Sequence, residues 1–232
     1  MTKQKIAAGT IVLGLTLGAA GLAVAAPYTA MAPAAQYMMG SPGEEIALAR
    51  SAAPVSISGD AEVLVLGAHG YQTAVKGSNG FVCLVERAWD ADFKDPVFWN
   101  PAIRGADCLN PEAARTMLPH FRERAAWALA GVSKADMLAR TRAELAAHTY
   151  SLPGPGAVAF MQSKRQILAG DPPHWHPHMM FFVANMKDAA WGANAAGSPV
   201  MTGVEGSDPI TTFMVPLGKW SDGTPDTGMD MK

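Results

Sequence analysis

Residues 62–85, EVLVLGAHGYQTAVKGSNGFVCLV, contain three short apolar runs separated by two glycine-bearing turns. The runs are Glu62 to Leu66, Tyr71 to Lys76 and Phe81 to Val85. They are rich in β-branched, aromatic and other apolar residues, which favour a pleated, half-buried strand. Glycine-bearing turns between such runs are typical of an antiparallel meander, so we predict three consecutive strands here.

Two helices are predicted in the middle of the chain. Asn110-Pro111-Glu112 combines a cap residue, a proline at the first helical position and an acidic first turn. Apolar residues then recur every fourth position from Met117 to Leu129, although Pro119 should kink or split this helix. Gly131 ends it, and residues 133–147 begin with a Ser-x-x-Asp pattern typical of a second helix start.

Strand character returns in three later runs, which are Ala157 to Gln162, His178 to Val183 and Ile210 to Val215. Strands, then helices, then strands is the order of an α+β fold rather than of a doubly wound parallel sheet. We therefore predict an antiparallel sheet of about five or six short strands, with two central helices packed on it and one disulfide.

The first 25 residues have the three parts of a secretory signal peptide. Lys3 and Lys5 precede an apolar run from Ile6 to about Leu22, and Ala23-Val24-Ala25 offers a small-residue cleavage site. A retained membrane anchor is the alternative, because about 20 apolar residues can span a bilayer. The run is rich in glycine and alanine and lacks a charged stop-transfer cluster, which favours cleavage and a periplasmic or secreted protein with no stable membrane anchor.

The rest of the chain divides into three parts. Residues 26–54 are predicted to be a flexible lead-in with a short helix from Ser41-Pro42 to about Ala52. Residues 55–218 have the length of a single α+β globular domain. Residues 219–232 are poor in apolar side chains, so we predict a disordered tail.

The charge balance argues against two classes of partner. The chain has 18 basic and 20 acidic residues, and loss of the leader would remove Lys3 and Lys5. A mildly acidic protein lacks the basic surface that nucleic acids and anionic membranes require, so we predict neither as a primary partner. The expected partner is therefore an unknown small molecule or another protein.

The chain contains two cysteines, Cys83 and Cys108. In an exported protein an even cysteine count is typical of a disulfide, and the spacing fits no zinc motif. Because we interpret residues 88–110 as a long loop, the bridge should tie the end of a strand to the start of a helix. Trp89, Phe93 and residues 98–99 would anchor this loop in the core, or line a ligand groove.

The sequence His174-Trp175-His176-Pro177-His178 is the densest cluster of candidate ligands. In an extended segment His174, His176 and His178 would share one face, opposite Trp175 and Pro177. Two of them could reach one metal ion, but the first and the third are about 13 Å apart on a straight strand. A further ligand would then come from His69, His120, His148 or Glu86.

Zinc and copper are the candidate metals. Zinc suits imidazole with an open coordination position, and copper suits imidazole near a soft thioether such as Met179 or Met180. The alternative is that the methionines belong to an ordinary buried strand and that the histidines are structural or contact a substrate.

The pairs His174-x-His176 and His176-x-His178 resemble the first metal motif of the cupin barrels. The resemblance ends there, because residues 179–182 are Met-Met-Phe-Phe where the motif's glutamate would follow. It assigns the chain to no family.

Other catalytic signatures do not occur. No Gly-x-Ser-x-Gly elbow, His-Glu-x-x-His helix or phosphate-binding glycine loop is found. Asp90-x-Asp92-x-x-Asp95 lacks the glycine and the terminal glutamate of a calcium loop. Two hypotheses remain: an exported protein that binds zinc or copper through the histidine cluster, with or without catalysis, and a non-catalytic envelope or secreted protein that binds or packs without a metal.

Overall fold

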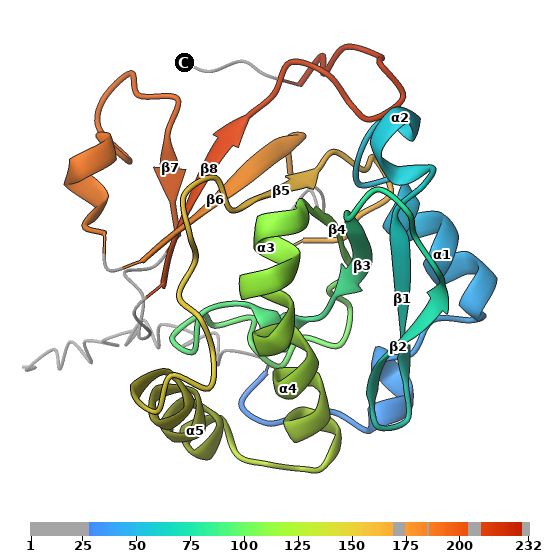
Figure 1. Cartoon of the computed structure of the whole chain (residues 1–232), viewed down its shortest axis with the longest axis vertical. Coiled ribbons are helices and arrows are strands. Elements are labelled where there is room, and N and C mark those ends of the chain that lie inside the picture. The colour runs from blue at the N-terminus through green and yellow to red at the C-terminus, as the bar shows by residue number, and fades with distance from the viewer. Residues whose placement is uncertain (1–27, 169–174, 185, 204–209, 229–232) are drawn as a thin grey trace, which may run out of the picture.

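The computed structural model describes residues 28–168, 175–184, 186–203 and 210–228. In these ranges eight strands form one sheet in the order β2-β1-β3-β4-β5-β6-β8-β7 (Figure 1). The strands are β1 (Glu62–Gly67), β2 (Gly70–Val75), β3 (Val82–Glu86), β4 (Gly105–Leu109), β5 (Val158–Met161), β6 (His178–Ala184), β7 (Met201–Thr202) and β8 (Ile210–Pro216).

Five α-helices and three 3₁₀ turns accompany the sheet in the described ranges. The helices are α1 (Pro42–Arg50), α2 (Val55–Ser58), α3 (Pro111–Thr116), α4 (Leu118–Leu129) and α5 (Lys134–Ala146). The 3₁₀ turns are η1 (Ala34–Tyr37), η2 (Ala88–Asp90) and η3 (Asp188–Trp191). The predicted α+β class and single disulfide are confirmed, whereas the predicted counts of strands and helices are too low.

The helix starts follow the sequence signals closely. The side chains of Asn110 and Ser133 accept hydrogen bonds from backbone N–H groups in the first turns of α3 and α5. Pro119 lies in the first turn of α4, and the predicted long helix is split at Met117 into α3 and α4. A proline cannot donate the hydrogen bond that a continuous helix needs, which explains the split.

The predicted meander is correct for its first hairpin and wrong for its third strand. β1 and β2 pair antiparallel, but β3 pairs parallel with β1 on the other side. The connection therefore crosses the start of β1, where Ser78 N donates to Asp60 O at 2.8 Å. A Cβ on Gly77 would lie 2.1 Å from Glu62 N, so only glycine allows this close crossing.

The predicted long loop over residues 88–110 contains a central strand. β4 pairs antiparallel with β3 and places Cys83 directly opposite Cys108. The disulfide therefore joins two neighbouring strands, with 4.0 Å between the Cα atoms, rather than a strand and a helix. The aromatic residues of the remaining loop are its anchors, since Trp89, Phe93 and Phe98 are all buried in the main core.

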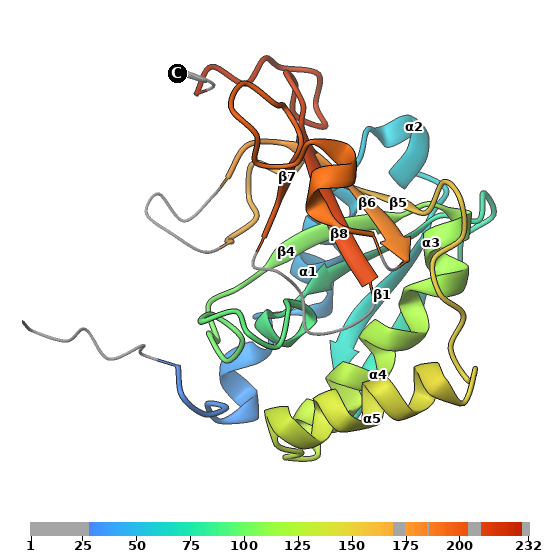
Figure 2. The ribbon, with the colours of Figure 1, turned by 90° about the vertical axis from the view of Figure 1, so that its left-hand side faces the viewer.

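The two faces of the sheet are covered differently. Helix α1 packs on one face over β1, β3 and β4, around the disulfide. Helices α3 and α4 cover the other face, where the larger core lies. Figure 2 shows α4 and α5 at one end of the molecule and β7, β8 and the C-terminal segment at the other.

Both segments that flank the sheet make specific contacts. In the segment expected to be a flexible lead-in, the Tyr37 side chain is fully buried and its hydroxyl donates to Trp99 O at 2.8 Å. In the segment expected to be a disordered tail, Ser221 N donates to Gln162 O, and Lys164 pairs with Asp222 at 2.8 Å.

No helix in the described part of the chain is long and apolar enough to cross a membrane. The predicted signal peptide lies outside the described residues.

Candidate functional site

The described residues line a cavity of about 910 Å³ on the α3–α4 side of the sheet. Alternate residues of β6 and β8 form one wall, because His178, Met180 and Phe182 point to this face of the sheet. Helices α3 and α4 are joined at Met117, which lines the cavity together with Phe121 of α4. The lining of the cavity combines apolar side chains with ionisable ones. The ionisable side chains lie on β3, η2, α4 and β6, and Asp92, Asp95, Lys187 and Asp188 add further charges.

Two carboxyl groups lie side by side at the inner end of the cavity. Glu86 is opposite Gly105 and Asp107 is opposite Leu84, so the two acids are diagonal neighbours on one face of β3 and β4. A hydrogen bond links the two side chains, the backbone N–H of Cys108 donates to Asp107, and both Asp107 oxygens retain unused accepting capacity. Asp107 is fully buried, whereas Glu86 faces the cavity.

Burial makes it costly for both carboxyls to be ionised together. Desolvation and the neighbouring Asp107 charge raise the pKa of Glu86 well above its ordinary value. Desolvation also raises the pKa of Asp107, to about 7, although the hydrogen bond from Glu86 opposes this shift. At neutral pH the pair therefore holds at least one proton, and Glu86 can donate a hydrogen bond to Asp107, as expected for two carboxyls in one low-dielectric site.

A third carboxyl, Asp90 of η2, also lines the cavity. Its Oδ2 accepts hydrogen bonds from Arg87 N at 2.9 Å and from the Tyr71 hydroxyl at 3.2 Å, while Oδ1 has no partner among the described residues. Burial raises the pKa of Asp90 to about 6 against these hydrogen bonds. Arg124 of α4 brings a positive charge to the same region and donates to Ala91 O.

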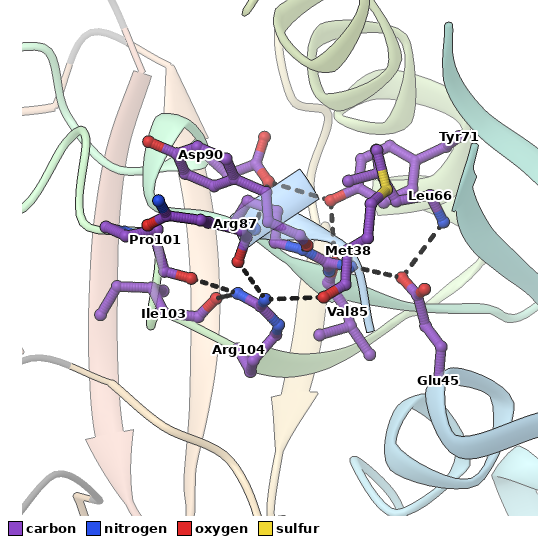
Figure 3. Close-up of polar contacts among 12 residues, drawn as sticks. Met38, Glu45, Leu66, Tyr71, Val85, Arg87, Asp90, Pro101, Ile103 and Arg104 are labelled. Carbon is purple, nitrogen blue, oxygen red and sulfur yellow. Dashed lines mark hydrogen bonds and ion pairs between the residues drawn. The ribbon is translucent and has the colours of Figure 1, made fainter. Parts of the chain in front are cut away.

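A buried ion pair between Arg87 and Glu45 lies next to the ionisable side chains of the cavity. Arg87 donates from Nη2 to Glu45 Oε1 at 2.8 Å and from Nε to Tyr37 O at 2.7 Å. Its Nη1 donates to Val85 O, which also accepts from the Tyr71 hydroxyl. Figure 3 shows these contacts, with α1 on one side of Arg87 and Asp90 on the other.

His178 is held in one tautomer inside the cavity. Its Nδ1 lies 2.8 Å from the backbone oxygen of His176, and a carbonyl can only accept, so Nδ1 carries the proton and Nε2 is the free acceptor. Burial lowers the pKa of His178 to about 4. His120 of α4 lines the same cavity, and burial with the nearby Arg124 lowers its pKa to about 4 as well.

The two described histidines of the cluster, His176 and His178, do not share one face in the way the sequence indicated. His174 lies outside the described residues. His176 Nδ1 is 2.6 Å from Asp226 Oδ2 in the C-terminal segment, whereas His178 lines the cavity. The Trp175 ring is 4.6 Å from the His178 ring and lines the same cavity, because β6 begins only at His178 and strict alternation does not extend upstream.

The other predicted ligands are divided. Glu86 and His120 reach the cavity of His178, but His69 and His148 are exposed and do not line it. Within the described ranges no group of three or more His, Cys, Asp or Glu side chains could hold a metal ion. With His174 outside these ranges, the predicted zinc or copper site stays a prediction.

Sequence reasoning missed Asp107, Arg124 and the role of Trp175. Asp107 is the one charged residue of β4, in the stretch Gly105–Leu109 whose other residues are apolar or glycine. A carboxylate between Ala106 and Cys108, the latter predicted to be in a buried disulfide, was the available signal. Arg124 stands on the predicted helix, four residues after His120 and thus on the same face.

Comparisons with protein families, with curated proteins and with solved structures find no match to this chain.

The buried carboxyl pair predicts a specific pH dependence. In the native protein Asp107 binds its proton up to about pH 7, whereas an unfolded aspartate releases it near pH 4. Between these values the native state holds more protons, so ionisation of Asp107 lowers the free energy of unfolding as the pH rises. Asp107→Asn should remove this loss. The free energy of unfolding of the variant, relative to that of the parent protein, should therefore rise by up to about 1.4 kcal/mol per pH unit between about pH 4 and pH 7.

Urea denaturation of both proteins from pH 4 to pH 8 measures this difference. Comparing variant with parent cancels the opposite contribution of His120 and His178, whose lowered pKa values make stability rise with pH between about 4 and 6.5. A difference between the two proteins that stays flat or falls over this window would contradict the assignment.

Proposed function

We propose that this chain is an exported protein that binds a small amphipathic molecule in the cavity between the sheet and helices α3 and α4. The single observation that carries the proposal is the cavity itself. Its volume of about 910 Å³ lies in the range of small-molecule sites. An apolar lining with a few convergent polar groups of shifted pKa is also typical of such sites.

The construction of the cavity supports binding rather than simple packing. A space of this size inside a protein would normally be filled by side chains, because protein interiors have few voids larger than a water molecule. Here the wall includes ionisable side chains on β3, η2 and α4, and a rigid, neutral imidazole on β6. Keeping such groups together beside an open space opposes stability, which is a common feature of functional sites.

Binding can be tested with Nile red, a neutral fluorophore whose emission rises in apolar surroundings. Met180 and Met214 are paired across β6 and β8 and line the cavity, so Met180→Trp/Met214→Trp should narrow it and weaken Nile red binding at least tenfold. Fluorescence titration of the purified protein measures the affinity.

The matched control uses the next register pair. Met179 and Val215 are also paired across β6 and β8, but neither lines the cavity. Met179→Trp/Val215→Trp should change Nile red affinity less than about twofold. Absence of binding by the parent protein, or equal losses in the two double variants, would overturn the proposed function.

A second candidate function, binding of zinc or copper, is favoured by one observation. His176 and His178 both engage Nδ1 with an oxygen, Asp226 Oδ2 and a backbone carbonyl respectively, which leaves both Nε2 atoms available. Metal-binding histidines commonly have such an oxygen partner on the other ring nitrogen.

Elemental analysis of untagged protein after incubation with zinc or copper and desalting tests this candidate. The metal hypothesis predicts about one ion per chain, reduced at least tenfold by His176→Ala. His69→Ala should retain the ion because His69 is exposed and does not line the cavity. A protein that retains no metal would refute it.

A further inference from the structure

We propose that the ligand of the cavity carries a protonated amino group, which is held at the Glu86–Asp107 carboxyl pair beside Asp90, with its apolar part against the methionine and phenylalanine wall. This inference rests on the proposed small-molecule site and adds the chemical class of its ligand.

The charge distribution of the site favours a cation. Glu86, Asp90 and the adjacent Asp107 bring three carboxyls to the inner end, where Arg124 is a neighbouring positive charge. Arg87 also lines this end, but its guanidinium is already bound to Glu45 and to two backbone carbonyls. An amine would place a further positive charge beside the three carboxyls, whereas a carboxylate or phosphate ligand would add to the repulsion among them.

The hydrogen-bonding capacity points in the same direction. Oδ1 of Asp90, which lines the cavity, has no hydrogen-bond partner among the described residues, and the adjacent Asp107 oxygens retain capacity to accept further hydrogen bonds. Carboxylate oxygens are acceptors, and an unsatisfied buried acceptor costs about 1–3 kcal/mol. An ammonium group has three donors and no acceptor, so it complements this set of atoms.

The remaining surface suits the apolar part of an amphipathic amine. The wall beyond the carboxyls consists mainly of thioether and hydrocarbon side chains, namely Met117, Phe121, Met161, Leu168, Met180 and Phe182. Gly105, opposite Glu86 on β4, leaves room beside the carboxyl pair for Met161 and Leu168, because a Cβ there would lie 3.0 Å from Met161 Cε. The carboxyls and the apolar wall are thus contiguous.

Binding of a cation should be linked to proton release. The carboxyl pair shares a proton at neutral pH, and a bound ammonium group stabilises the fully ionised pair. Asp90 on η2, Arg124 and His120 on α4, and His178 on β6 line the cavity with Glu86. The other charged residues of its lining are Arg87, Asp92, Asp95, Lys187 and Asp188. The two histidines are already neutral at pH 6.5, so the released proton comes from the carboxyls.

The test uses three probes with the same alkyl chain: octylamine, octanol and octanoate. Isothermal titration calorimetry of the purified protein at pH 6.5 should give octylamine an affinity at least tenfold higher than that of octanol, with octanoate the weakest. Repeating the octylamine titration in buffers of different ionisation enthalpy should reveal that protons are released when the amine binds.

Glu86→Gln should weaken octylamine binding at least tenfold, abolish most of the proton release and change octanol binding less than threefold. Glu112→Gln is the matched control, because Glu112 lies outside the cavity and forms an ion pair with Arg115 on α3. It should leave all three affinities unchanged. Nile red binding by both variants verifies that the cavity is intact.

The outcomes separate this inference from the function on which it rests. If octanol or octanoate binds as tightly as octylamine, or if octylamine binds without proton release, the amine proposal is wrong while the cavity remains a binding site. If neither Nile red nor any of the alkyl probes binds, both proposals fail.

Discussion

The ion pair between Arg87 and Glu45 is the interaction on which the rest of the structure depends. Both side chains are almost completely removed from solvent, and the guanidinium contacts three separate parts of the chain. It binds α1 through Glu45, η1 through Tyr37 O and the end of β3 through Val85 O. Glu45 also accepts from Leu66 N, which adds β1 to the same network. A buried charge of this kind is tolerated only because nearly every polar atom has a partner.

This network also determines the shape of the candidate site. The Arg87 N–H donates to Asp90, so the residue that anchors α1 also orients a carboxyl of the cavity. Tyr71 from β2 donates to Val85 O and to Asp90, which ties the edge hairpin to the same point. A second arginine, Arg104, donates to Gln36 O and Met38 O and holds the N-terminal segment against the loop before β4 (Figure 3). Hydrogen bonds from several elements thus fix the carboxyl of Asp90 in place, as a preorganised binding site requires.

Local signals in the sequence were sufficient for some elements and insufficient for others. The helix starts at Asn110 and Ser133 were predictable because a cap acts through its own side chain and the next three residues. The parallel pairing of β1 and β3 could not be predicted locally. It requires the connection between β2 and β3 to cross the start of β1 closely at Gly77. Strand β4 was missed because glycine and aspartate are uncommon in strands.

Only single residues of the candidate site could be predicted, because the site is assembled from segments that are far apart in the sequence. His178 was recognised as part of the histidine cluster and Glu86 as a possible further ligand, but Asp107, the partner of Glu86, lies on the strand that was interpreted as a loop. The alternation rule placed Trp175 opposite His178, yet both line the cavity because the strand starts at His178. Whether the histidine cluster binds zinc or copper, and whether residues 1–25 are a signal peptide, stay predictions.

A double-mutant cycle on Arg87 and Glu45 is the most direct test of this account. Arg87→Met and Glu45→Gln should each lower the free energy of unfolding in urea by about 3–5 kcal/mol, because each leaves a buried group without its partner. The double variant should lose clearly less than the sum, with a coupling energy of at least about 2 kcal/mol, whereas the exposed pair Glu112 and Arg115 should show less than about 1 kcal/mol. Additive losses at Arg87 and Glu45, or single losses as small as those of the exposed pair, would contradict the claim that this ion pair holds the fold together.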